Sequence, residues 1–195
     1  MDHYFTEKPS SDDSVFKINI LLKKDSFSLF SSSGLFSKLE LDKASELLIE
    51  NALIKGNSVL DLGCGYGVVG ISLLRMNPDL RVVFSDVNER ALLITRRNLA
   101  YLKLKGVVLK SNLFENIDEK FDVILSNPPY AAGRVVCFAL IEDSIKYLNQ
   151  GGTLQIVARH NKGGKVLSEK MFEIFGNVES VAKKGGFRVY VSIKN

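Results

Sequence analysis

The sequence predicts an α/β fold built on a doubly wound, mostly parallel seven-stranded sheet. From Ser58 onward, short β-branched or apolar runs alternate with helical patterns, which is typical of βαβ units. Gly and Pro residues mark most of the boundaries between these segments. The sequence Lys-Lys-Gly-Gly at 183–186 indicates a tight turn, so the last two strands should form a C-terminal antiparallel hairpin.

The expected strands and helices follow one another at short intervals. The strands are Ser58–Leu62, Val82–Ser85, Gly106–Leu109, Val123–Ser126, Thr153–Ala158, Val178–Lys183 and Phe187–Ile193. The helices are Val69–Met76, Glu89–Leu102, Val135–Leu148 and Gly164–Phe175, with a further helix expected at Asp42–Ala52.

The N-terminal quarter has a different pattern. A polar start is followed by an apolar stretch at Val15–Leu22 and a Ser-rich segment at Ser26–Ser33. We therefore expect residues 1–45 to form an N-terminal extension packed on the core, and residues 46–195 to form a single α/β domain.

The composition is that of a globular protein, with 46% hydrophobic and 25% charged residues. No apolar stretch approaches the roughly 20 residues that a membrane span needs, and the start does not resemble a signal peptide, so a cytoplasmic location is expected. Cys64 and Cys137 are isolated in the sequence, which predicts reduced, packed thiols and no metal site. A monomer is expected.

The net charge of +4 is unevenly distributed. Residues 159–195 contain eight basic and three acidic side chains, which gives this segment +5. Such a face is either simply solvated or binds a polyanion.

A glycine loop follows the first buried strand: Asp61-Leu62-Gly63-Cys64-Gly65-Tyr66-Gly67. Glycines allow tight turns and the close approach of a ligand, but Gly65-x-Gly67-x-x-Gly70 alone also fits a dinucleotide-binding loop. Asp61 at the end of a buried strand needs a partner, and the cationic end of S-adenosylmethionine is a natural one. Asp86, after the second strand, could accept both ribose hydroxyl protons or act in the helix N-cap.

The chemistry is expected in the loop after the fourth strand, Asn127-Pro128-Pro129-Tyr130. Two prolines stiffen the loop and leave carbonyl oxygens as acceptors. The amide oxygen of Asn127 and the main-chain oxygen of Pro128 could bind both hydrogens of one NH₂ group, which would make its nitrogen nucleophilic without a general base. Tyr130 offers a flat surface for a planar base or amide.

Together, Asp61–Gly67, Asp86 and Asn127–Tyr130 resemble the Rossmann-like class I methyltransferases that methylate amino groups. Ser33-Gly34-Leu35-Phe36-Ser37 with Asp42, and Lys184-Gly185-Gly186-Phe187-Arg188-Val189, resemble more closely the small ribosomal RNA guanine-N2 methyltransferases and their archaeal homologues. The resemblance covers nearly the whole chain.

The resemblance implies S-adenosylmethionine as cofactor and a set of residues around it. Phe36 would help to wall the pocket, Asp61 and Gly63 would lie near the methionine end with Cys64, Gly65 and Gly67, and Val87, Asn112 and Leu113 would lie near the adenine. Aspartate is commoner in the family at the position of Asn112, whose amide oxygen can still accept a hydrogen bond.

The expected reaction is methylation of an exocyclic amino group, with guanine N2 of ribosomal RNA as the preferred substrate. Three alternatives remain at this stage: a protein glutamine, adenine N6, and a non-catalytic RNA-binding module with the same fold. A nicotinamide-dependent oxidoreductase would leave the Asn-Pro-Pro-Tyr loop unexplained.

Overall fold

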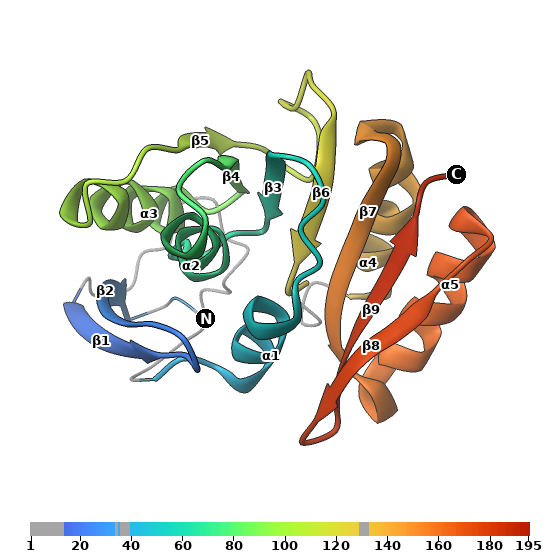
Figure 1. Cartoon of the computed structure of the whole chain (residues 1–195), viewed down its shortest axis with the longest axis horizontal. Helices are drawn as coiled ribbons and strands as arrows, with labels where there is room; N and C mark the ends of the chain where they lie inside the picture. The colour runs from blue at the N-terminus through green and yellow to red at the C-terminus, as the bar shows by residue number, and fades with distance from the viewer. Residues whose placement is uncertain (1–13, 34, 36–39, 129–132) are drawn as a thin grey trace.

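A single seven-stranded sheet forms the centre of the protein (Figure 1). We describe residues 14–33, 35, 40–128 and 133–195 of a computed structural model. The strand order is β5-β4-β3-β6-β7-β9-β8, and the neighbours are parallel from β5 to β7 and antiparallel from β7 to β8. The strands are β3 (Ser58–Leu62), β4 (Arg81–Asp86), β5 (Val107–Lys110), β6 (Phe121–Ser126), β7 (Leu148–Arg159), β8 (Glu179–Lys184) and β9 (Phe187–Ile193).

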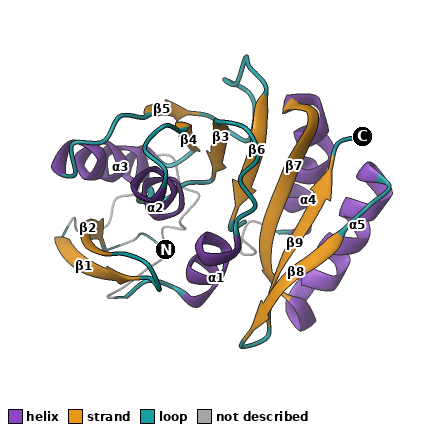
Figure 2. Ribbon diagram, in the orientation of Figure 1, coloured by secondary structure: helices purple, strands orange, loops and turns teal. Residues whose placement is uncertain are grey.

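Helices cover both faces of this sheet (Figure 2). They are α1 (Lys43–Asn51), α2 (Val68–Met76), α3 (Glu89–Tyr101), α4 (Arg134–Ser144) and α5 (Lys165–Phe175). One apolar core contains side chains of α1, α2 and α3, and a second contains side chains of α4 and α5. This two-sided burial explains why the central strands carry continuous apolar runs.

The N-terminal segment forms an antiparallel pair of strands, β1 (Val15–Leu21) and β2 (Ser26–Ser32). Ile18, Ile20 and Leu29 are buried in the first core. A bidentate ion pair from Arg75 of α2 to Asp25, with N–O distances of 2.6 and 2.8 Å, fixes the turn between the two strands. Strands β1 and β2 therefore pack on the side of the sheet that carries α1, α2 and α3, and they do not extend the central sheet.

The predicted fold class is confirmed, and the differences are local. The predicted helix Val135–Leu148 ends as an α-helix at Ser144 and continues as a 3₁₀ turn over Ile145–Tyr147. Strand β7 starts at Leu148, five residues before the prediction, because Gly151 and Gly152 lie within an irregular stretch of the strand. The division at residue 45 remains a prediction, since α1 spans it.

The C-terminal hairpin follows the prediction closely. Gly185 and Gly186 connect β8 and β9 with φ of +57° and +83°. Two consecutive positive φ angles belong to the tight hairpin turns that glycine favours. None of the helices described is long and apolar enough to cross a membrane.

Candidate functional site

The candidate site lies at the carboxyl edge of the sheet, where β3 and β6 are neighbours. The chain leaves β3 towards α2 on one face and leaves β6 towards α4 on the other, which creates a topological switch point. Ligands of open α/β sheets bind in the crevice at such a point. The Ser126 hydroxyl donates to the Leu62 carbonyl oxygen at 2.8 Å, so the start of the Asn127 loop lies beside the start of the glycine loop.

The glycine loop needs its glycines for conformation. Gly63, Gly65 and Gly67 have φ of +72°, +58° and +85°, which side chains other than glycine rarely adopt. A Cβ on Gly63 would meet nothing within 4 Å, so this exposed position offers open space to a ligand. A Cβ on Gly67 would lie 2.9 Å from the Thr95 side chain.

Gly70 has a packing role in the first turn of α2. A Cβ there would lie 2.4 Å from the Phe84 ring, so only glycine lets the helix approach β4 this closely. Its N–H donates to Asp61 Oδ2 at 2.8 Å. The third glycine of the fingerprint therefore serves helix packing and holds the Asp61 carboxylate.

Asp61 is a buried carboxylate at the end of β3, with 2% exposure. Burial raises its pKa to about 7, the Gly70 N–H opposes this rise, and the nearby Asp86 charge adds to it. A buried carboxylate of this kind is well suited to binding a cationic ligand. The positive charge of the ligand would offset the free-energy cost of burying the ionised carboxylate.

Asp86 ends β4 and has both carboxylate oxygens engaged. Oδ2 accepts the Gly65 N–H and Oδ1 accepts the Asn88 N–H, each at 2.9 Å. The cap of α3 is Asn88, whose side chain accepts from Arg90 and Ala91. Asp86 therefore links the glycine loop to the start of α3.

Two polar residues of α3 donate hydrogen bonds to the glycine loop, and neither was predicted from the sequence. Thr95 donates to the Gly65 carbonyl oxygen at 2.8 Å. Asn98 donates to the Tyr66 and Phe30 carbonyl oxygens at 2.9 Å and accepts the Phe30 N–H at 2.7 Å. Their spacing of three residues on a predicted helix facing the loop was the available signal.

The thiol of Cys64 is turned away from the open edge. It is buried in the first core, 3.9 Å from the Thr95 hydroxyl, and burial raises its pKa well above the ordinary value. Cys137 is also buried and unpaired, as expected from the sequence.

The residues predicted to surround an adenine lie in the loops after β4 and β5. Asn112 is exposed, and its Nδ2 donates to Glu115 at 3.0 Å, which leaves its Oδ1 as an acceptor. Leu113 has a φ of +51°, and its carbonyl oxygen accepts the Ser111 hydroxyl at 2.9 Å. Val87 is half-buried after β4.

Asn127 is half-buried directly after β6, and its amide orientation is fixed by α1. Its Nδ2 donates to Ser45 Oγ at 3.1 Å and to Asp42 Oδ1 at 3.3 Å. Pro128 is buried beside it. With the NH₂ group directed at α1, the Asn127 side chain presents its carbonyl oxygen as the remaining polar atom. Phe36, Pro129 and Tyr130, which were also predicted in the site, lie outside the described residues.

A small hollow of about 140 Å³ lies between the starts of α4 and α5. It is lined by Gly133, Arg134, Cys137, Gly163, Val166 and Leu167. Within the described part of the chain, no group of three or more His, Cys, Asp or Glu side chains could hold a metal ion.

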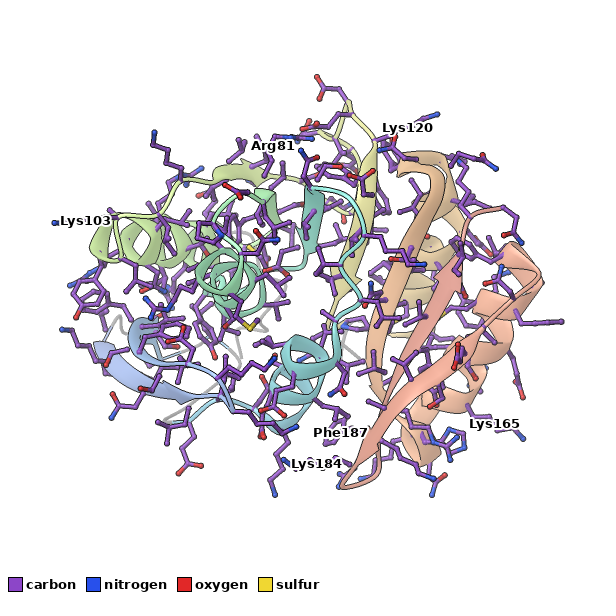
Figure 3. The ribbon with its side chains drawn as sticks, in the orientation of Figure 1. Arg81, Lys103, Lys120, Lys165, Lys184 and Phe187 are labelled. Carbon is purple, nitrogen blue, oxygen red and sulfur yellow. The ribbon has the colours of Figure 1, made fainter. Side chains whose placement is uncertain are left out.

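Basic side chains gather at the same edge of the sheet. Figure 3 shows Lys165, Lys184 and Phe187 at the lower end of the molecule, whereas Arg81 and Lys120 lie at the opposite end. Basic residues at or next to the carboxyl edge on the side of β6, β7 and the C-terminal hairpin are Arg134, Arg159, Lys162, Lys165, Lys183, Lys184 and Arg188. Lys184 is engaged by Glu46 of α1 at 2.8 Å, and Lys162 and Lys183 are exposed.

The sheet order, the glycine loop with its buried aspartate and the position of Asn127 at the same edge define a class I methyltransferase that uses S-adenosylmethionine. The chain belongs to the methyltransferase small domain family, whose model matches residues 26–191.

Known proteins similar to this chain support that assignment. YbxB of Bacillus subtilis, itself described as uncharacterized, is 38% identical over 96% of both chains. Ribosomal RNA small subunit methyltransferase C of Actinobacillus pleuropneumoniae is 39% identical over 83% of this chain but only 50% of its own length. The chain thus spans about half the length of that relative.

A solved structure shows the same fold. The Thermus thermophilus 16S rRNA N2 G1207 methyltransferase RsmC, in complex with AdoMet and guanosine, superposes with a TM-score of 0.80 at 24% identity. The match covers 96% of this chain and 52% of RsmC.

Proposed function

We propose that this protein transfers a methyl group from S-adenosylmethionine to the exocyclic N2 of a guanine in ribosomal RNA. The observation that carries the proposal is the orientation of Asn127, whose NH₂ group donates to Asp42 and Ser45. The amide oxygen is left to accept a hydrogen from an amino group. An acceptor at this position suits a substrate that brings N–H donors, as guanine N2 does.

The cofactor supplies an electrophilic methyl group on a positively charged sulfur. In our proposal Asp61 faces its cationic end, the glycine loop approaches it closely, and Asp86 accepts from its ribose. Asn112 Oδ1 accepts from the adenine amino group. The backbone of Gly63 and Cys64 is already held in place, since both N–H groups donate to the Ser85 carbonyl oxygen at 2.8 and 2.9 Å.

At the substrate, Asn127 Oδ1 and the Pro128 carbonyl oxygen bind the two hydrogens of the amino group. This draws the nitrogen lone pair out of conjugation with the ring and aims it at the methyl group, so catalysis depends mainly on positioning. Tyr130 stacks on the base. As the nitrogen–carbon bond forms, the bond between the methyl carbon and the sulfur would break, neutral S-adenosylhomocysteine would leave, and the amino proton that the nitrogen loses would pass to water.

Ribosomal RNA is preferred to protein as substrate for two reasons. The relatives named as ribosomal RNA methyltransferases match most of this chain, and the carboxyl edge carries the basic residues described above. Phosphate groups bind such an edge by electrostatic attraction, whereas a protein glutamine has no need of it.

Labelled S-adenosylmethionine with ribosomal RNA or total protein as acceptor tests the proposal. Nucleoside analysis should show N2-methylguanosine, and Asn127→Ala should lower turnover at least about 100-fold while retaining cofactor binding. Label in N6-methyladenosine would change the target base, and label only in protein would exclude RNA. Near-normal turnover by Asn127→Ala would contradict the role of Asn127.

A further inference from the structure

We infer that Asp42 and Ser45 are positioning residues that set the amide of Asn127 for the reaction. The inference rests on the proposed function, in which the Asn127 oxygen accepts from the substrate amino group. Asp42 is the N-cap residue of α1, and Ser45 lies in the first turn of this helix. In the chain they precede Asn127 by 85 and 82 residues. They therefore belong to a different element from Asn127, which follows β6.

The geometry uses both hydrogens of the Asn127 amide. Nδ2 lies 3.1 Å from Ser45 Oγ and 3.3 Å from Asp42 Oδ1, so each hydrogen has an acceptor. The opposite orientation would place the Asn127 oxygen against a carboxylate, which is repulsive. The contact therefore determines which end of the amide faces α1.

Asp42 is itself held rigidly. Its Oδ1 caps α1 by accepting the N–H groups of Ala44 at 3.0 Å and Ser45 at 2.9 Å. Ser45 is 4% exposed. The helix is anchored at both ends, because the Leu53 N–H donates to Gln155 of β7 and Glu46 pairs with Lys184 at the hairpin. A rigid acceptor pair limits the rotation of the Asn127 side chain.

The charge of Asp42 also adds to the acceptor strength of Asn127. An amide whose N–H groups donate to a carboxylate carries more negative charge on its oxygen, since hydrogen bonds in a chain polarise one another. The Asn127 oxygen should then hold a substrate amino group more tightly than an amide bonded to water would. In this series of hydrogen bonds Asp42 carries the negative charge, and Asn127 Oδ1 is the atom that accepts from the substrate amino group.

Three variants separate this role from that of a simple helix cap. Asp42→Gly removes the acceptor, yet glycine is a well-tolerated residue at a helix N-cap. Asp42→Asn keeps the cap and removes the charge. Ser45→Ala removes the second acceptor with a residue that favours helix.

The experiment combines turnover with NMR of the Asn127 side-chain amide, assigned through Asn127→Ala. In the wild type the two amide protons should be shifted and slow to exchange, and in Asp42→Gly they should move to free-amide positions. Turnover should fall at least about tenfold in Asp42→Gly and less in Asp42→Asn, at unchanged cofactor affinity. In the Asn127→Ala background Asp42→Gly should have no further effect, because Asp42 acts through Asn127.

The inference would be overturned if the losses of turnover were fully additive in the double variant. It would also be overturned if the NMR signals of the Asn127 amide were unchanged in Asp42→Gly. If the amide signals behave as expected but the wild type methylates no amino group in RNA, free nucleoside or protein, the proposed function fails while the positioning contact stands.

Discussion

Asp61 Oδ2 accepts the N–H of Gly70 at 2.8 Å, and this bond joins the end of β3 to the first turn of α2 behind the glycine loop. The carboxylate is buried among protein atoms, and its pKa of about 7 reflects the cost of desolvation and the nearby Asp86 charge. The protonation state of Asp61 should therefore change when a charged ligand binds nearby.

The first prediction is proton release on cofactor binding. The pKa of Asp61 is raised in the folded protein, so the free protein loses stability as the pH rises from about 4 through about 7. A cationic ligand favours the ionised form and lowers this pKa. Below about pH 7 binding should thus release a proton, and affinity should increase with pH up to about 7.

Calorimetry of S-adenosylmethionine binding in two buffers of different protonation enthalpy measures this release. Asp61→Asn keeps an acceptor for the Gly70 N–H but cannot ionise, so it should abolish the release and weaken binding. Equal proton release by wild type and Asp61→Asn would assign the proton to another group.

The second prediction concerns Asn98, which bonds to Phe30 in β2 and to Tyr66 in the glycine loop. Asn98→Ala should remove these three hydrogen bonds and lower the free energy of unfolding by roughly 2–4 kcal/mol, since each contributes about 0.5–1.5 kcal/mol. Asn57→Ala, at an exposed side chain, is the matched control. Urea denaturation measures the free energy of unfolding of both variants. Equally small losses of stability in the two variants would show that Asn98 does not anchor the N-terminal strands.

The third prediction concerns acid stability and Asp122 of β6. Burial alone would raise its pKa, but hydrogen bonds from Asn149, Ser58 and the Asn57 N–H outweigh this and lower it to about 2. Because the folded pKa is depressed, the stability is present above about pH 4 and is lost as the pH falls through about 2.

Asp122→Asn should therefore destabilise the protein at neutral pH by roughly 1–3 kcal/mol and flatten its loss of stability between about pH 4 and 2. Asp118→Asn, at an exposed carboxylate, should change neither. Thermal unfolding across this pH range provides the measurement, and an unchanged acid profile in Asp122→Asn would argue against the role of this carboxylate.

The elements that sequence predicted best are those defined by local chemistry. The strand Ser58–Leu62 and the Gly185–Gly186 turn were predicted because apolar runs and paired glycines act within a few residues. The β1–β2 pair was missed as a hairpin, although Lys17 and Asn19 alternate with Phe16, Ile18 and Ile20 as in a strand with one buried face.

The site could be predicted only as separate motifs. Nothing in the local pattern around Asn127 shows that Asp42 and Ser45 bind its amide, because that contact depends on how α1 packs on the sheet. Likewise Gly70 was interpreted as part of a ligand loop, and its contact with Phe84 became visible only with α2 placed against β4.

The last prediction concerns RNA and the basic edge. Lys183 and Lys184 are adjacent basic residues beside the turn of the C-terminal hairpin, but Lys184 pairs with Glu46, and its loss would also disturb α1. Lys162 and Lys183 are exposed and are therefore the cleaner test. Lys162→Glu with Lys183→Glu should raise the apparent Michaelis constant for RNA and leave S-adenosylmethionine binding unchanged. Each lost phosphate contact should also remove about a threefold change in affinity between about 50 and 200 mM salt.

Lys103→Glu with Lys120→Glu, away from this edge in Figure 3, removes the same charge and is the control. An identical effect of both pairs would mean that net charge alone attracts the RNA, and no effect of either would place the RNA elsewhere on the protein.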